Sequence, residues 1–372
     1  MNQRKAAEFE IKLKKVRTFL QSKGFDGIWL AEPENIAWLT CGGSNRIDLT
    51  SPWGSFGLLV TQIRVIAFAG NNEMARVRQE ELNGLEIETV TFPWYEGYVD
   101  IYVAKYTQGL RVAADRFSSN FSFLGAEFAG LRYQLTPWEK ERYRNLARDT
   151  AEILRQTCVE IKPGLSEHKI AAMVAGRFRE CDIRPYVLLI AADERIGGFR
   201  HPIPTSKTVE NSVMISVCGE RSGLVVSQTR LVNFGKLSDD LQKRHQAVVT
   251  IEAEMFAQTY EGNELKEVFL KAVQTYESLG YGEEWKLHHQ GGPTGYKGRE
   301  DVVKPSHKGK VLLDQAFAWN PSISGTKGED TIIAGLSQPE ILGQIPDWPY
   351  LEVKVGEQVY KRPDILVRNK YS

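Results

Sequence analysis

The chain has 372 residues, which is enough for two domains. Lys and Arg number 47, Asp and Glu also number 47, and 42% of the residues are hydrophobic. This balance argues against intrinsic disorder and against a chain built mainly to bind nucleic acid or an anionic membrane. We therefore expect a small-molecule partner, no nucleic acid and no membrane.

The cysteines and the N-terminal residues indicate a reducing compartment. Cys41, Cys158, Cys181 and Cys218 lie far apart and form no C-x-x-C, which argues against a zinc ribbon, a dithiol motif or a disulfide framework. The first residues, MNQRKAAEFEIKLKK, have no apolar core of a signal peptide, and no stretch approaches 18 uncharged apolar residues. We expect a cytoplasmic protein.

Strands and helices alternate in the first part of the chain. Phe9, Leu13, Val16 and Leu20 recur at helical spacing, and Gly24 is placed to end that helix. Short helices are expected at 33–39 and 74–82, and strands at 27–30, 57–60, 64–69, 85–92 and 111–114. This alternation predicts an α/β layer domain.

A new helix begins at Thr136-Pro137-Trp138-Glu139, which combines a capping box with proline at the first helical position. We place the domain boundary just before it, giving domains at 1–133 and 134–372. Helices are expected from 137 to about 161, from 167 to about 181, and after Ser238 and Asn263; strands are expected at 186–191, 213–217, 223–226, 311–320 and 330–333. The grouping of these elements predicts an α+β fold.

Local motifs exclude some chemistries. The glycine-rich stretch 291–298 lacks the Gly-Lys-Ser/Thr ending of a phosphate loop and fits no G-x-G-x-x-G, so a tight turn is the better interpretation. The six histidines form no H-x-x-x-H pair and no finger spacing with cysteines. His288 and His289 are adjacent, so in a strand their side chains would point to opposite faces.

Three segments place ionisable groups beside turn residues and close to expected strands, where rigid scaffolds often display catalytic groups. They are 197–202, 288–300 and 319–330. Each segment also has a structural explanation. His201 precedes a proline and is compatible with a packing role. The charged residues of Arg299-Glu300-Asp301 and of Glu329-Asp330 are compatible with groups that are simply solvated.

Read in order, these segments resemble the pita-bread superfamily of creatinase, prolidase, aminopeptidase P and methionine aminopeptidase. GFDGIWLAEPENIAWLTC is similar to the creatinase/prolidase N-terminal domain, and TPWEKERYRNLARDTAEIL and KPGLSEHKIA are similar to the start of the catalytic domain. The resemblance covers nearly the whole chain. It implies an N-terminal creatinase/prolidase-like α/β domain, a pita-bread domain and a homodimer.

The resemblance also implies a dinuclear metal site, whose five ligand positions can be checked in this chain. The family's two aspartates fall at Val217 and at Ser227 or Gln228, its histidine at Gly292, and its first glutamate at Asn320. Only the second glutamate is kept, as Glu329. Because catalytic metal sites present at least three protein ligands, we expect no metal at this location and no cofactor.

Creatinase works without metal, and His201 matches the position of its catalytic histidine. Where the family has His-Glu, this chain has Arg299-Glu300. The resemblance thus implies His201 as general acid and base, with Glu300 and Glu329 orienting the substrate. Because a guanidinium can clamp a carboxylate, we expect Arg299 to bind an acid group of the substrate. Further side chains are expected to bind substrate: Ser227, Asn320, Tyr296, Arg230 and His288.

Three functions remain open. The first is metal-independent hydrolysis of a C–N bond in a small guanidino, ureido, amide or amidine compound. The second is a catalytically inactive relative that serves as a binding module. The third is a metal-dependent Xaa-Pro aminopeptidase or dipeptidase.

Overall fold

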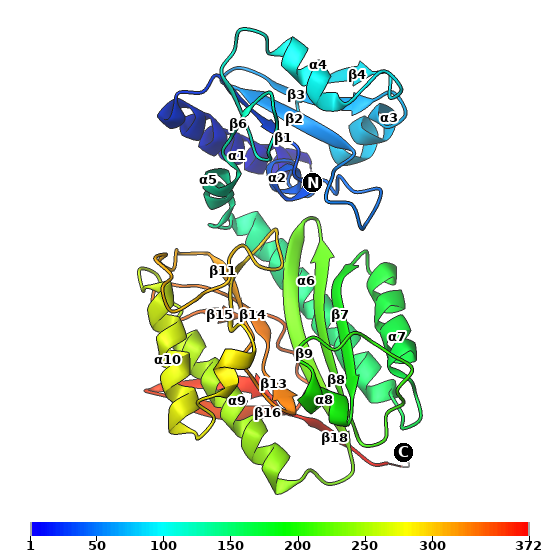
Figure 1. The fold of residues 1–372 in the computed structure, drawn as a ribbon, viewed down its shortest axis with the longest axis vertical. Helices are drawn as coiled ribbons and strands as arrows, with labels where there is room; N and C mark the ends of the chain where they lie inside the picture. Colours follow the sequence, from blue (N-terminus) through cyan, green and yellow to red (C-terminus); the bar gives the residue numbers. More distant parts are fainter. Residues whose placement is uncertain (1, 371–372) are drawn as a thin grey trace. The chain divides into compact units, whose positions relative to one another are not determined.

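The computed structural model describes residues 2–370 and consists of two compact units (Figure 1). The first unit ends at Tyr133 and also includes Ser222–Leu224; the second comprises Gln134–Arg221 and the residues from Val225 onward. Within the described residues, no helix is both long enough and apolar enough to cross a membrane.

The first unit is a mixed six-stranded sheet with helices around it. The strand order is β4-β3-β2-β1-β5-β6, in which β1 pairs antiparallel with β2 and parallel with β5. The strands are β1 (Gly27–Leu30), β2 (Phe56–Thr61), β3 (Val65–Gly70), β4 (Glu88–Phe92), β5 (Val112–Ala114) and β6 (Ser122–Phe123). The helices are α1 (Asn2–Lys23), α2 (Pro33–Leu39), α3 (Met74–Arg76), α4 (Val99–Tyr106) and α5 (Gly125–Ala129), with a π-helical turn at Val77–Glu81 and a 3-10 turn at Gly130–Arg132.

The expected elements of this part are present, with two differences. The helix expected at 74–82 changes into the π-helical turn after Arg76, and β4 begins at Glu88, three residues later than expected. The helix α4 was not predicted, because Val103 is the only residue that it buries and its sequence therefore carries little helical periodicity.

The second unit contains two four-stranded sheets, ordered β18-β9-β8-β7 and β10-β11-β14-β15, and two hairpins, β12–β13 and β16–β17. Its strands are β7 (Arg184–Ala192), β8 (Ser212–Arg221), β9 (Leu224–Phe234), β10 (Gly291–Thr294), β11 (Ala316–Trp319), β12 (Ser322–Ile323), β13 (Thr326–Lys327), β14 (Asp330–Ile333), β15 (Glu340–Ile341), β16 (Tyr350–Val355), β17 (Gln358–Pro363) and β18 (Leu366–Arg368). Its helices are α6 (Pro137–Glu160), α7 (Glu167–Glu180), α8 (Glu194–Gly198), α9 (Asp239–Ala257) and α10 (Leu265–Ser278), with a 3-10 turn at Glu284–Leu287.

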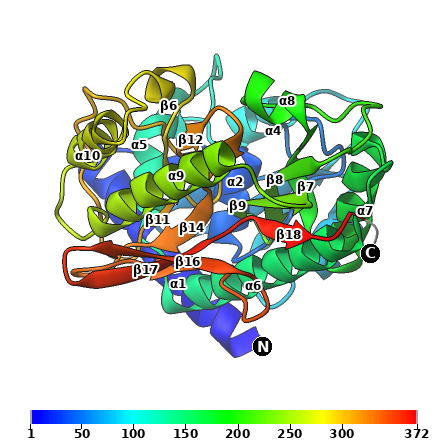
Figure 2. The ribbon, with the colours of Figure 1, turned by 90° about the horizontal axis from the view of Figure 1, so that it is seen from below.

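Local capping starts the long helices of this unit. The Thr136 side chain accepts from the Glu139 backbone N–H, and the Glu139 carboxylate accepts from the Thr136 N–H, which completes the expected capping box of α6. The Ser166 and Ser238 side chains cap α7 and α9 by accepting from the N–H groups of Lys169 and Leu241, without the reciprocal bond. The helix α9 lies between α10 and the β16–β17 hairpin (Figure 2), and together they enclose one apolar core.

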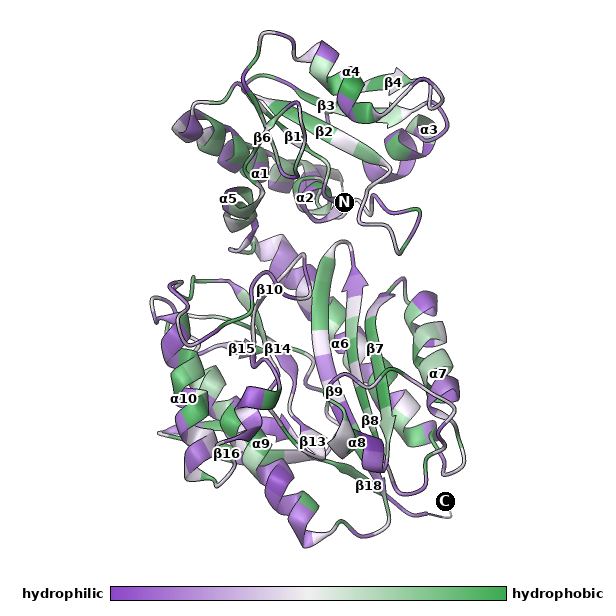
Figure 3. Ribbon diagram, viewed as in Figure 1, coloured by the Kyte–Doolittle hydropathy of each residue, from purple (hydrophilic) through white to green (hydrophobic). Residues whose placement is uncertain are grey.

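The two sheets of the second unit meet along β9. The N–H of Thr229 donates to the carbonyl of Glu329 at 3.0 Å, and the N–H of Ser227 donates to Thr331 Oγ1 at 2.8 Å. Figure 3 shows β9 changing from hydrophobic to hydrophilic along its length, where Ser227–Arg230 follow the apolar residues 224–226. Polar side chains are therefore buried at the junction of the sheets.

Candidate functional site

A buried carboxylate, Glu329, lies at this junction, between β13 and β14. Its Oε2 is 2.7 Å from the ammonium of Lys327, and its Oε1 is 3.1 Å from the guanidinium of Arg299. Thr229 and Ser216 donate their hydroxyls to Oε2 at 2.7 and 3.0 Å. Burial alone would raise the pKa of Glu329, but Lys327, Arg299 and these hydrogen bonds outweigh it and hold the pKa below its ordinary value.

Strand alternation decides which neighbours face Glu329. On β9, Ser227 and Thr229 point toward it, whereas Gln228 turns away and donates to the carbonyl of Ala147 in α6. On β8, Ser216 contacts Glu329, and Cys218 Sγ lies 3.1 Å from Ser227 Oγ. The alignment with Val217 at the first aspartate position is therefore corrected: Ser216, two strand residues before Cys218, faces the site.

A cavity of about 200 Å³ opens beside Glu329. Residues from several separate parts of the second unit line it: Tyr186, Val187, Leu189, His201, Ser216, Cys218, His289, Gly298, Arg299, Asn320, Lys327 and Glu329. Four residues expected at the site are in this lining, namely His201, Arg299, Asn320 and Glu329. Ser227 lies directly behind it, accepting from Arg299 at 3.2 Å.

Three other expected residues lie elsewhere. The Tyr296 hydroxyl donates to Glu139 of α6 at 2.6 Å, and Arg230 reaches the opposite side of β9, where it contacts Asp330 at 3.0 Å. Among the described residues, the cavity lining includes Arg299 but not Glu300, whose backbone N–H donates to Pro293 O at 2.8 Å. Strand alternation separates Arg230 from Thr229 on β9, whereas Arg299 and Glu300 lie in the irregular segment that follows β10.

Three histidines meet at one side of the cavity. His201 follows α8 and is exposed, whereas His288 and His289 follow the 3-10 turn and precede β10. The Nε2 atoms of His201 and His288 are 3.2 Å apart, and the rings of His288 and His289 are 4.5 Å apart between centroids. The two adjacent histidines therefore do not point to opposite faces, because they lie in a connecting segment rather than in a strand.

The environment keeps these imidazoles neutral. Burial, with a contribution from Lys327, lowers the pKa of His288 to about 2; burial, with a contribution from Arg299, lowers the pKa of His289 to about 4. The pKa of His201 is also lowered, by the partial desolvation of its ring and then by Lys327. A neutral imidazole can accept a proton or bind a metal ion.

Besides Nδ1 of His289, two polar atoms of the cavity lining have no partner within residues 2–370. They are Asn320 Oδ1 and Arg299 Nε, both buried. Buried polar atoms are nearly always hydrogen-bonded in native proteins, so each such atom calls for an explanation. Asn320 Oδ1 can therefore accept a hydrogen bond from a bound molecule, and Arg299 Nε can donate one to it.

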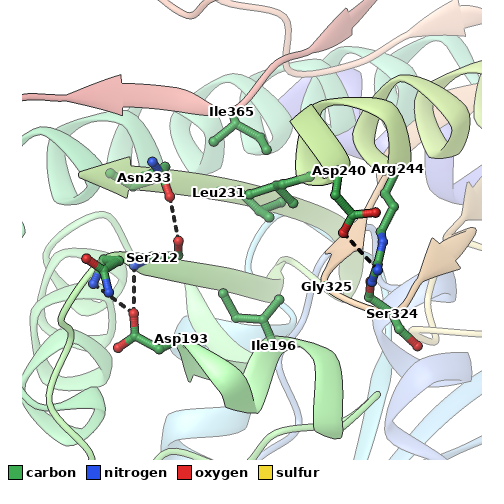
Figure 4. Close-up of a pocket in the computed structure, with 13 residues that line it drawn as sticks. Asp193, Ile196, Ser212, Leu231, Asn233, Asp240, Arg244, Ser324, Gly325 and Ile365 are labelled. Atoms are coloured by element: carbon green, nitrogen blue, oxygen red, sulfur yellow. Dashed lines mark hydrogen bonds and ion pairs between the residues drawn. The ribbon is translucent and has the colours of Figure 1, made fainter. Parts of the chain in front are cut away.

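A larger cavity, of about 310 Å³, lies where β8 begins and β9 ends (Figure 4). Its polar groups are paired with one another: Ser212 donates to Asn233 at 2.6 Å, and Arg244 lies 2.8 Å from Asp240. Asp193 accepts from the backbone N–H groups of residues 210–212. With these groups satisfied, this cavity is the weaker candidate.

The fold is that of solved Xaa-Pro peptidases. A prolidase from Pyrococcus horikoshii superposes with a TM-score of 0.77 at 18% identity, covering 90% of this chain and 98% of that one. An Xaa-Pro dipeptidase from Bacillus anthracis gives 0.75 at 16% identity, with 97% and 100% covered. The N-terminal domain of the FACT complex subunit SPT16 from chickpea gives 0.70 at 11% identity, with 92% and 97% covered. The predicted α+β, pita-bread fold is confirmed.

The sequence places the chain in a family as well. No curated protein matches it in sequence. Residues 141–335, more than half of the chain, match metallopeptidase family M24. The chain belongs to this family of peptidase-like hydrolases, and the predicted resemblance to the creatinase, prolidase and aminopeptidase P superfamily is confirmed.

The residues present do not fit the family's two metal ions. On the alignment that the resemblance implies, Ser216, Ser227 and Asn320 stand in place of carboxylates. The remaining carboxylate, Glu329, is held by Lys327 and Arg299. At Gly292, where the family has a histidine, a Cβ atom would lie 2.5 Å from the carbonyl oxygen of Asp301. The backbone thus leaves no room for a side chain there, and one carboxylate among hydroxyls is not a dinuclear donor set.

Sequence reasoning missed Lys327, Thr229, Ser216 and His289. Thr229 is two residues after Ser227 in the same strand, so the period of two was an available signal for it; Lys327 lies two residues before Glu329 but in a different element. No local signal marked the approach of His289 to His201, because 88 residues separate them in the chain.

Proposed function

We propose that this protein hydrolyses the amide bond of a small, dipeptide-like substrate that carries a free carboxylate, and that it does so without the family's two-metal centre. Membership of family M24 and the prolidase fold favour the dipeptidase alternative over hydrolysis of a guanidino compound. The observation that carries the proposal is the pair of unpartnered atoms, Asn320 Oδ1 and Arg299 Nε, in the cavity that also holds His201.

Substrate binding would use these atoms. The planar guanidinium of Arg299 suits a carboxylate, and its Nε has a hydrogen to donate. Asn320 Oδ1 would accept an N–H of the substrate. Glu329 stays ionised because its pKa is lowered, so it fixes Lys327 and Arg299 at the cavity rather than transferring protons.

The chemical step is assigned to His201. Its ring is neutral at pH 7 because its pKa lies below the ordinary value, so it can take a proton from a water molecule that attacks the carbonyl carbon. The resulting oxyanion would be stabilised by Lys327, a buried cation in the cavity lining. His201 then returns the proton to the leaving nitrogen as the C–N bond breaks.

The experiment is an assay of tag-free protein against Xaa-Pro dipeptides, N-acyl amino acids and guanidino acids, in buffer containing EDTA. We expect turnover of an amide substrate, lost in His201→Ala and kept in His168→Ala, a matched histidine on α7 away from the cavity. Activity that needs added Mn²⁺ or Co²⁺ would instead support metal-dependent peptidase chemistry. Full activity in His201→Ala would refute the catalytic role.

Glu329 is the one metal-ligand residue of the family that this chain keeps, and it is paired with Lys327. This ion pair favours a second candidate function, a binding module without turnover. Measurable affinity for a dipeptide or an N-acyl amino acid, with no hydrolysis across the panel, would decide for it.

We also propose that residues 1–133 form a creatinase/prolidase-like N-terminal domain and 134–372 the catalytic-type domain of a cytoplasmic homodimer. Light scattering of the purified chain tests the dimer, and fractionation of the source cells tests the location.

A further inference from the structure

The three histidines at the cavity form a group that the proposed reaction does not fully use. One ring nitrogen from each of His201, His288 and His289 lies within 4.8 Å of the others. Hydrolysis as proposed needs only His201. The other two imidazoles are packed against it and partly or fully buried.

The spacing is that of imidazoles around one ion. Two nitrogens bound to the same tetrahedral zinc are about 3.4 Å apart, given Zn–N bonds of about 2.0–2.1 Å. The Nε2 atoms of His201 and His288 are 3.2 Å apart. Two such atoms can share only one hydrogen in the absence of an ion.

The ring atoms also lack the partners that buried histidines usually have. Nδ1 of His288 and Nδ1 of His289 are buried without a hydrogen-bond partner in the described chain. His288 is 92% buried, since its exposed fraction is 8%. One imidazole binds an ion through one nitrogen, and His288 would use the Nε2 that faces His201. The unpartnered nitrogen that points to a ligand the protein itself does not supply is therefore Nδ1 of His289.

We propose that His201, His288 and His289 bind one divalent transition-metal ion of the imidazole-preferring class, such as Zn²⁺, Co²⁺ or Ni²⁺. Imidazole is a preferred donor for these ions, and three histidines leave a fourth position open to the cavity. This mononuclear site uses none of the family's ligand positions, which run through Ser216, Ser227, Gly292, Asn320 and Glu329.

Nearby charges set the strength of binding. The positive charges of Lys327 and Arg299 disfavour a positive charge at the histidines, and the negative charge of Glu329 favours one. The same charges act on a bound metal cation. Both cations are already paired with Glu329, so much of their charge is offset. We therefore expect moderate affinity, so that occupancy depends on the free metal concentration.

Metal binding has a consequence that rests on the proposed function. A metal-bound nitrogen of His201 can no longer take a proton from water. Occupancy and general-base catalysis therefore exclude one another, and the metal ion would be an inhibitor of the amide hydrolase.

The test is calorimetric titration of tag-free, EDTA-treated and dialysed protein with ZnCl₂, together with visible absorption on adding CoCl₂. We expect one Zn²⁺ per chain and the intense visible bands of tetrahedral Co²⁺. His288→Gln and His289→Gln should each weaken Zn²⁺ binding at least tenfold, whereas His168→Ala should bind as the wild type does; circular dichroism establishes that each variant is folded.

Absence of Zn²⁺ and Co²⁺ binding to the wild type would overturn the proposal, and so would equal binding by a folded His288→Gln/His289→Gln double variant.

The activity assay separates the metal site from the proposed function. Binding with loss of hydrolysis supports both proposals, and binding to a protein without any hydrolytic activity keeps the metal site while defeating the proposed function. Binding that raises activity keeps the site and overturns the role of His201 as base.

Discussion

The ammonium of Lys327 lies 2.7 Å from Glu329 Oε2, and the two side chains are only 5% and 4% exposed. Removing one member of a buried ion pair leaves the other charge without compensation, which costs about 3–5 kcal/mol. We expect Lys327→Met to lower the free energy of unfolding by about 3 kcal/mol, since Arg299 still contacts Glu329. Urea unfolding followed by circular dichroism measures this.

The matched double variant, Lys327→Met/Glu329→Gln, tests whether the two residues act as a pair. It should lose less stability than the sum of the single variants. Additive losses would show that the ion pair contributes no coupling.

Stability should fall on acidification because of the histidine cluster. The pKa values of His288 and His289 are lowered to about 2 and about 4, from an ordinary 6.5. Below pH 6.5 the unfolded chain therefore binds protons that the folded chain does not, so stability is full above that pH and is lost as the pH falls toward 4. The slope is at most about 1.4 kcal/mol per pH unit for each histidine.

Urea midpoints measured across this range should therefore drop for the wild type. In His288→Gln/His289→Gln the drop should be smaller, because glutamine does not titrate. Parallel pH profiles for the two proteins would contradict the assignment.

Arg299 should control recognition of the substrate carboxylate. Arg299→Lys keeps a cation but removes the Nε donor and the planar geometry, so we expect KM to rise about tenfold for a substrate with a free carboxylate. The methyl ester of the same substrate provides the control, and its KM should change little. An equal rise for acid and ester would place the effect elsewhere.

Arg362 should stabilise the second unit without touching the cavity. Its fully buried guanidinium lies 2.6 Å from Asp330 and 2.8 Å from Glu252. Arg362→Met leaves Glu252 without a cationic hydrogen-bond partner and should cost about 3–5 kcal/mol in urea unfolding.

The comparison variant is Arg144→Met, whose partner Glu340 is exposed, and it should cost less than about 1 kcal/mol. Similar losses in the two variants would argue against the buried network.

The sequence by itself determined much of this protein. The capping box at Thr136 and Glu139 and the strand Asp330–Ile333 depend on residues within a few positions of one another, and both were predicted correctly. The loss of four family ligand positions, with Glu329 retained, is also visible in residue types alone.

Only the tertiary structure decided what surrounds Glu329. Whether Ser216 or Val217 faces the cavity depends on the strand's orientation, which a shift of one residue reverses. The contact of His201 with His288 joins residues 87 positions apart. Such contacts arise when separate strands and connecting segments pack, so no local spacing encodes them, whereas a helix cap is fixed by its own turn.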